Sequence, residues 1–206
     1  PGMLEARILR SKVPHGRIVS IDVTEAWKVP GVRAVLTAKD IPAKAWGYSK
    51  DQVALKGDRV RRIGDELAAV AATDIEAATE ACERIKVVIE PLPAVYGMEA
   101  ALASGAPVLH ETRGTNLVQT HHYEHGKIED AFAKAAKVVE GTFVLPAQQH
   151  GALGPAGAIA EWDANGRLTI HDPTQIPFLV QRDLAEALDI SPADIRLVQP
   201  CVGGAF

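Results

Sequence analysis

The stretch from Asp172 to Phe206 alternates turns with one helix pattern and one strand pattern. Pro177 suits the first turn of a helix, where a backbone N–H has no intrahelical acceptor in any case. Residues 191–194, Ser-Pro-Ala-Asp, have the composition of a capped turn, and the apolar, β-branched residues 195–199 then favour a short strand. The apolar face of the helix is predicted to consist of Val180, Leu184 and Leu188. This order of elements predicts an α/β unit.

The last six residues, 201–206, form a glycine-rich end that follows the predicted strand. Gly203 and Gly204 allow positive φ angles and a close approach of a ligand to the main chain. Bare N–H groups in such a loop can bind an anionic or carbonyl-rich ligand. The pattern is neither a Walker loop nor the dinucleotide-binding GxGxxG. From these residues alone, a ligand loop and an ordinary turn both stay open.

The composition is that of an ordinary globular protein and excludes several classes of function. The chain has 206 residues, 47% of them hydrophobic, and a net charge of −4, so it lacks the basic footprint of a nucleic-acid-binding protein. No apolar run approaches membrane-spanning length, and the first residues lack the core of a signal peptide. Cys82 and Cys201 form no disulfide framework and no CxxC pair, which favours a reducing, cytoplasmic location and no metal site in this chain.

The first part of the chain reads as strands mixed with two helices. A capping box at 73–76 would begin the longer helix, and Cys82 lies on its apolar face, which predicts a core residue. The wholly apolar strand 67–72 is predicted to be buried on both faces, and the strand-helix-strand ending suggests one crossover unit. The predicted strands are 3–9, 17–23, 32–36, 59–63, 67–72 and 86–90, and the predicted helices are 24–28 and 75–85.

The second part follows a span between Pro93 and Asn116 that contains a short predicted helix at 98–103 and reads as a domain boundary. We expect a strand at 117–122, a helix at 128–136 that packs Phe132 inward, and a strand at 138–144. Residues 158–161 and 168–171, joined by an Asp-Ala-Asn-Gly turn, predict a hairpin. The chain begins within a strand pattern and ends within a loop, so we expect a piece of a longer polypeptide.

Three groups of polar residues are candidates for sites. His121, His122 and His125 form HHxxH, but adjacent histidines of a strand point to opposite faces, so surface histidines explain them better than a metal. The run 148–150, Gln-Gln-His, suits a polar pocket and a solvated loop equally. The third group, predicted to be outward charges on a strand, consists of Arg59, Arg61 and Arg62. No serine has the context of a nucleophile elbow.

The chain as a whole resembles the molybdenum-binding large subunit of the xanthine dehydrogenase and aldehyde oxidoreductase family. The resemblance rests on four motifs in the same order over nearly the whole chain. They are residues 11–18 against S-x-x-P-H-A-R-I, 29–37 against PGV-x-AV-x-T, 63–71 against x-G-[ED]-x-[VI]-A-x-V-x-A, and 88–94 against V-x-Y-E-x-LPA. It implies an α+β protein, with a hammerhead-type α/β domain at 1–95, a linker at 96–115 and the start of the first molybdopterin-binding α/β domain at 116–206.

The resemblance also implies cofactor contacts. In the family a glutamine after Ser or Thr hydrogen-bonds an oxygen ligand of molybdenum, and here Gln175 follows Thr174. A G-G-x-F-G loop lies beside the metal and pterin, and the matching residues are Gly203, Gly204, Ala205 and Phe206. The chain departs from a further family motif, QxHxxxEP, because Gly154 stands where the family has glutamate. Cys201 is not expected to be a ligand, and no catalytic or metal-ligating residue is expected in this chain.

The implied activity is that of a molybdenum-cofactor oxidoreductase acting on aromatic, N-heterocyclic or aldehyde substrates. The residues around 119–130 look more like the aromatic-acid branch, which includes 4-hydroxybenzoyl-CoA reductase, than like the xanthine enzymes. The implied cofactor is molybdenum–molybdopterin in the cytosine dinucleotide form, and the implied partners are an iron–sulfur (Fe-S) subunit and an FAD subunit that take the electrons. The chain alone is expected to be inactive and to hold no stable molybdenum. The alternative is a non-catalytic module that bridges the cofactor subunit to its electron-transfer partners.

Overall fold

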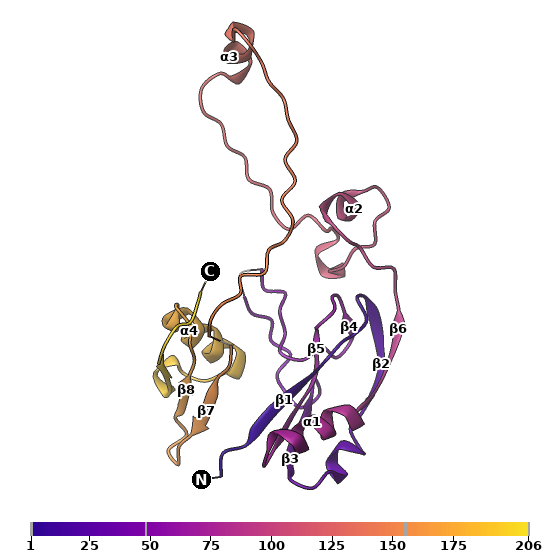
Figure 1. The fold of residues 1–206 in the computed structure, drawn as a ribbon, viewed down its shortest axis with the longest axis vertical. Helices are drawn as coiled ribbons and strands as arrows, with labels where there is room; N and C mark the ends of the chain where they lie inside the picture. The colour runs from indigo at the N-terminus through magenta and orange to yellow at the C-terminus, as the bar shows by residue number, and fades with distance from the viewer. Residues whose placement is uncertain (1, 48, 155, 206) are drawn as a thin grey trace.

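The computed structural model describes residues 2–47, 49–154 and 156–205, and it contains three small sheets with helices packed against two of them (Figure 1). The mixture of helices and strands confirms the α+β class. In the described ranges no helix is both long and apolar enough to cross a bilayer.

The first sheet has the order β1-β5-β3, and all its pairs are antiparallel. Its strands are β1 (Glu5–Arg10), β3 (Val32–Thr37) and β5 (Glu66–Ala72). The helix α1 (Ile75–Arg84) packs on this sheet and shares one core with it, together with the short 3₁₀ helix η1 (Ala26–Lys28). The fully buried members of this core include Ala26, Ala68, Val70, Ala72, Ala78 and Ala81. Small residues dominate, so the helix lies close to the sheet.

The second sheet has the order β4-β2-β6, again antiparallel, with strands β2 (Gly16–Asp22), β4 (Arg59–Val60) and β6 (Lys86–Pro91). The predicted crossover unit is therefore wrong, because β5 and β6 belong to different sheets. β5 already pairs with β1 on one side and β3 on the other, so neither edge is free for β6.

Two local predictions in this region also need correction. Asp74, not Thr73, is the N-cap of α1, because its carboxylate accepts the N–H of Ala77 at 2.8 Å. The predicted strand 59–63 stops at Val60, because the N–H groups of Arg61 and Arg62 turn to the buried carboxylate of Asp65 instead of a strand partner. Cys82 is buried in α1 as predicted.

The segment 96–116 is tied to the second sheet. It contains α2 (Met98–Leu102) and the 3₁₀ helix η2 (Glu111–Arg113). Arg59 pairs with Glu111 at 2.8 Å, and Arg61 donates to the carbonyl of Leu109 at 2.8 Å. These two arginines are thus partly covered, contrary to the prediction of outward charges, because residues Leu109 and Glu111 of this segment contact them. Arg62 remains mostly exposed and pairs with Asp65.

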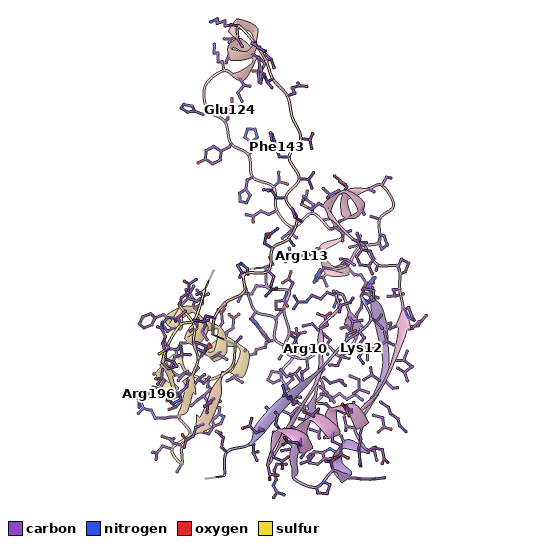
Figure 2. The ribbon with its side chains drawn as sticks, viewed as in Figure 1. Arg10, Lys12, Arg113, Glu124, Phe143 and Arg196 are labelled. Carbon is purple, nitrogen blue, oxygen red and sulfur yellow. The ribbon has the colours of Figure 1, made fainter. Side chains whose placement is uncertain are left out.

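Residues 117–153 form an extended arm that projects away from the sheets and carries α3 (Ile128–Lys134) at its tip (Figure 1). The predicted strands 117–122 and 138–144 are absent, and Phe132 is 60% exposed instead of packed inward. Phe143 and Glu124 face solvent on this arm (Figure 2). The apolar strand patterns fail because no strand among the described residues lies beside them to complete a ladder.

The third sheet has the order β7-β8-β9, with strands β7 (Ile159–Trp162), β8 (Leu168–His171) and β9 (Ile195–Val198). The predicted hairpin is confirmed: β7 and β8 pair in antiparallel fashion, and the Asp163 carboxylate accepts the N–H groups of Asn165 and Arg167 in the turn. The helix α4 (Pro177–Leu188) and the 3₁₀ helix η3 (Pro192–Asp194) connect β8 to β9. The buried core consists of Leu168, Ile170, Ala185 and Ile195, whereas Leu188 of the predicted face is 40% exposed.

Candidate functional site

The carboxyl ends of β8 and β9 meet at one edge of the third sheet, which we call the carboxyl edge. These strands are parallel, with His171 opposite Val198, so the segments 172–176 and 199–205 leave from the same place. The N–H of Asp172 donates to the carbonyl of Val198 at 3.0 Å, which holds the two exits together. Ligands in sheets with parallel strands bind outside such carboxyl ends.

A third segment reaches the carboxyl edge from the arm. β7 begins at Ile159, directly opposite His171, so residues 156–158, just before it, enter at this edge. The carbonyl of Gly203 accepts the N–H groups of Leu153, at 2.9 Å, and Gly154, at 3.3 Å. Three chain segments that are distant in sequence therefore converge at this edge.

Gly203 and Gly154 make this convergence possible because their main chains touch. A Cβ at Gly154 would stand 3.0 Å from the Cα of Gly203, and a Cβ at Gly203 would overlap the nitrogen and Cα of Gly154. The missing side chain of Gly203 thus serves a contact between two backbones, whereas the sequence suggested the approach of a ligand. Gly204 has φ +145°, in the region that favours glycine.

The N-terminus of α4 lies at the end of segment 172–176. Its N-cap is Ile176, which offers no side-chain hydrogen bond, and the first turn contains no acidic residue. The partial positive charge of a helix N-terminus favours an anion. Gln175, exposed one residue before this cap, is a neutral hydrogen-bonding group in the same segment.

The sequence-predicted site residues thus separate into two groups. Topology brings Gln175 and the residues Gly203, Gly204 and Ala205 to the carboxyl edge, and Phe206 lies outside the described residues. The histidines of the HHxxH run are exposed on the arm, and the structure places them in coil instead of a strand. Across the described ranges, no three His, Cys, Asp or Glu side chains are close enough to hold a metal ion.

Two ion pairs at the end of α4 away from the carboxyl edge have no signal in the sequence. The loop between β3 and β4 reaches α4, where Lys44 pairs with Asp189 at 2.7 Å and Lys50 pairs with Glu186 at 2.6 Å. The hydrogen bond from Lys44 lowers the pKa of the Asp189 carboxyl. Exposed pairs of this kind contribute about 0–1 kcal/mol each. They orient the C-terminal half of α4, and their partners are more than 130 residues apart in sequence.

Comparison with known proteins gives matches over both regions. The profile of the aldehyde oxidase and xanthine dehydrogenase a/b hammerhead domain matches residues 1–93, and that of the molybdopterin cofactor-binding domain matches residues 109–206. The chain is 36% identical to the nicotinate dehydrogenase large molybdopterin subunit of Eubacterium barkeri, over all of this chain and 48% of that protein. It is 38% identical to a probable xanthine dehydrogenase protein of Bacillus subtilis, over all of this chain and 28% of that protein.

A solved structure agrees over the full length. The structure of quinoline 2-oxidoreductase from Pseudomonas putida 86 superposes with a TM-score of 0.89 at 32% identity, covering all of this chain and 27% of the other. The chain therefore spans about half or less of the length of the relatives it matches.

Proposed function

Because this chain belongs to the family of molybdenum-binding subunits of xanthine dehydrogenases and aldehyde oxidoreductases, we propose that it forms part of a molybdenum-cofactor oxidoreductase. The substrates would be aromatic, N-heterocyclic or aldehyde compounds. Relatives with the words nicotinate, xanthine and quinoline in their names support this range. The proposed electron acceptors are Fe-S and FAD partner subunits, and the proposed location is the cytoplasm.

The proposed roles within the chain follow from its two regions. Residues 1–95 would form the hammerhead domain, 96–115 a linker, and 116–206 the start of the cofactor-binding domain. The matched ranges support this division, as does Asn116, whose side chain closes the linker through hydrogen bonds to Leu109, Ala101 and Pro107.

The observation that carries the proposal is the convergence of Gln175 and the loop 199–205 at the carboxyl edge. A pterin dithiolene, in the cytosine dinucleotide form, is bulky, polar and anionic. The residues present fit such a group, because the edge offers a neutral amide, a loop poor in side chains, and a helix N-terminus with no acidic residue in its first turn. When bound, the molybdenum centre would supply the redox chemistry.

The chain's own residues would bind and orient this group. We propose that the Gln175 side chain donates or accepts hydrogen bonds beside the metal. Because this amide is neutral, it does not change the net charge of the site, which the cofactor alone would determine. Main-chain N–H groups at Gly204, Ala205 and Phe206 would hold the pterin, and the small side chains would leave room for its approach. The contact of Gly154 with Gly203 would fix the position of that loop.

Molybdenum content tests this proposal. In the complete subunit, Gly204→Val adds a branched side chain at φ +145° in the proposed cofactor loop. We expect at least a tenfold loss of molybdenum, measured by mass spectrometry, with the fold retained by circular dichroism. The control is Gly126→Val on the arm, where the glycine also has a positive φ and an added Cβ would meet nothing within 4 Å. Full molybdenum content in the Gly204→Val subunit would refute the assigned site and favour the bridging-module alternative.

A further inference from the structure

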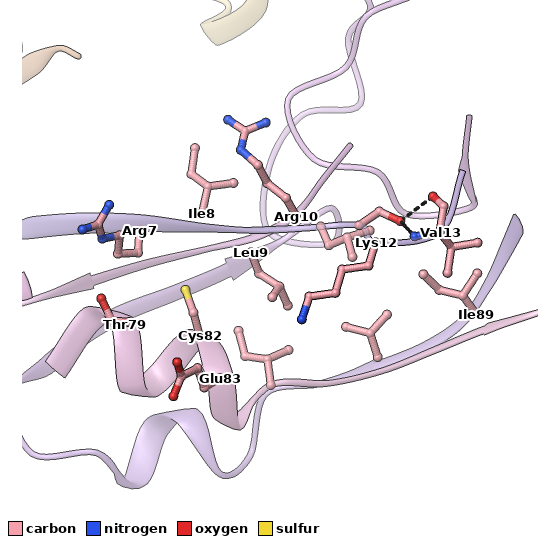
Figure 3. Close-up of a pocket in the computed structure, with 14 residues that line it drawn as sticks. Arg7, Ile8, Leu9, Arg10, Lys12, Val13, Thr79, Cys82, Glu83 and Ile89 are labelled. Atoms are coloured by element: carbon pink, nitrogen blue, oxygen red, sulfur yellow. Dashed lines mark hydrogen bonds between the residues drawn. The ribbon is translucent and has the colours of Figure 1, made fainter. Parts of the chain in front are cut away.

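A groove of about 850 Å³ lies between β1 and β6 (Figure 3). Its lining comes from β1, β5, α1 and β6, and the turn that joins β1 to β2 closes one end. The apolar residues that line it include Leu9, Val13, Leu67, Ile85, Val87 and Ile89.

Both strands beside the groove have an unpaired edge. β1 is the last strand of the first sheet, and β6 is the last strand of the second, so within the described chain each pairs on one side only. Unpaired N–H and C=O groups along a strand edge are a template for another strand. Leu4, just before β1, and Ile8, within it, are 41% and 46% exposed. β1 contains no proline, and its pairing with β5 is regular from Glu5 to Leu9, with a register shift only between Leu9 and Arg10.

The charges at the groove are unbalanced. Lys12 points into the groove, whereas Arg10 points away from it (Figure 3). Arg10 is held by the carbonyl of Gly64 and by Glu66, but Lys12 and Arg7 have no hydrogen-bond or ion-pair partner in the described part of the chain. With Arg10 paired outside the groove, the lining retains two unpaired cations, Lys12 and Arg7, against a single acid, Glu83. The groove is therefore complementary to an occupant with a carboxylate.

We propose that this groove binds an extended segment of a partner polypeptide, which adds a strand to β1 and places a carboxylate side chain beside Lys12. Strand addition gives affinity through main-chain hydrogen bonds and selects alternate side chains through pockets. Here the apolar floor takes every second side chain of the segment. Lys12 then selects an acidic residue at one of these inward positions, and this pairing fixes the register of the added strand.

The test uses random octapeptides displayed on phage and selected against the 206-residue chain. We expect selected peptides to alternate apolar residues with other residues and to carry an acid at one position. As synthetic peptides they should slow amide hydrogen exchange in residues 5–10. Lys12→Glu should weaken their binding about tenfold by fluorescence anisotropy, because repulsion replaces attraction. Lys39→Glu, an exposed lysine outside the groove lining, is the matched control and should leave binding unchanged.

A charge exchange completes the test. Replacing the acid of a selected peptide with lysine should restore its binding to the Lys12→Glu chain and weaken its binding to the unchanged chain. The proposal is overturned if selection yields no peptide that protects β1, if the selected peptides bind as helices against α1, or if Lys12→Glu leaves the affinity unchanged.

Discussion

The N-terminal sheets and the arm contain apolar segments of similar pattern, yet only the sheets bury them. Val70 in β5 is 1% exposed, between two partner strands and under α1. Val139 in the arm is 81% exposed, although the pattern of its segment predicts a strand on equally good grounds. The difference shows that an apolar pattern indicates which residues favour burial. Whether they form a strand depends on the presence of neighbouring segments that can pair with them and cover them.

The largest expected effect tests this contrast between the sheets and the arm directly. Val70→Asp places an unpaired carboxylate in the core and should lower the free energy of unfolding by about 4 kcal/mol. The same change at Val139 should alter it by less than about 0.5 kcal/mol, because that side chain is already in water. Urea unfolding followed by circular dichroism measures both. Equal losses in the two variants would show that the arm has a packed state.

The contact between Gly203 and Gly154 should give the next largest effect. Gly203→Ala should raise the rate of amide exchange at Leu153 and Gly154, with a local cost of about 1–3 kcal/mol, because the new Cβ overlaps the facing main chain. Gly157→Ala is the control, since its Cβ meets nothing within 4 Å. Unchanged exchange in the Gly203→Ala chain would mean that the two loops do not touch in solution.

Asn116 ties the end of the segment 96–116 to its start, and its replacement should give an effect similar to or smaller than that of Gly203→Ala. Asn116→Ala removes a hydrogen-bond acceptor for Leu109 N–H and two donors, to Ala101 and Pro107. We expect the linker to open more easily by about 1–2 kcal/mol, seen as faster proteolysis between residues 101 and 116. Gln119→Ala, exposed on the arm, should leave the cleavage rate as it is. Equal rates in both variants would contradict a closing role for Asn116.

The smallest expected effect is acid sensitivity at the start of α1. Hydrogen bonds from Ala77 N–H and then the Thr73 hydroxyl lower the pKa of Asp74 in the folded chain. A lowered pKa contributes stability above the unfolded value of about 4, and this contribution is lost as the pH falls through the folded value. Asp74→Asn should keep the cap and flatten the fall in urea midpoint between pH 5 and pH 2. Glu140→Gln should leave the pH profile unchanged, and an unchanged profile in Asp74→Asn would contradict the assignment.

The sequence predicts most strands of the first region and the hairpin of the third sheet, because their patterns and turns are local. Residues 163–166 are an example, since Asp163 closes the turn through its own neighbours. The sequence could not predict that β5 and β6 enter different sheets, because that depends on β1 and β3 taking both edges of β5.

The same distinction holds for the candidate site. The role of Gln175 came from a family motif alone, whereas the glycine pair was also a candidate from the residues themselves. The parallel pairing of β8 with β9 explains how the two segments meet. The role of Gly154 could not be seen in the sequence, because a glycine in a loop carries no sign of the backbone that it faces. In this chain it faces Gly203, about fifty residues away in the sequence.

The candidate site depends on the segments after β8 and β9 lying side by side at one edge. Cys201 is exposed in the second segment, and Gln175→Cys places another thiol in the first. A short bis-maleimide should join the two thiols within one molecule, as measured by mass spectrometry of the digested chain. Asp194→Cys, at the opposite end of β9, should give no such bridge. Failure of the Gln175→Cys chain to form the bridge, or equal bridging in the Asp194→Cys chain, would contradict this arrangement.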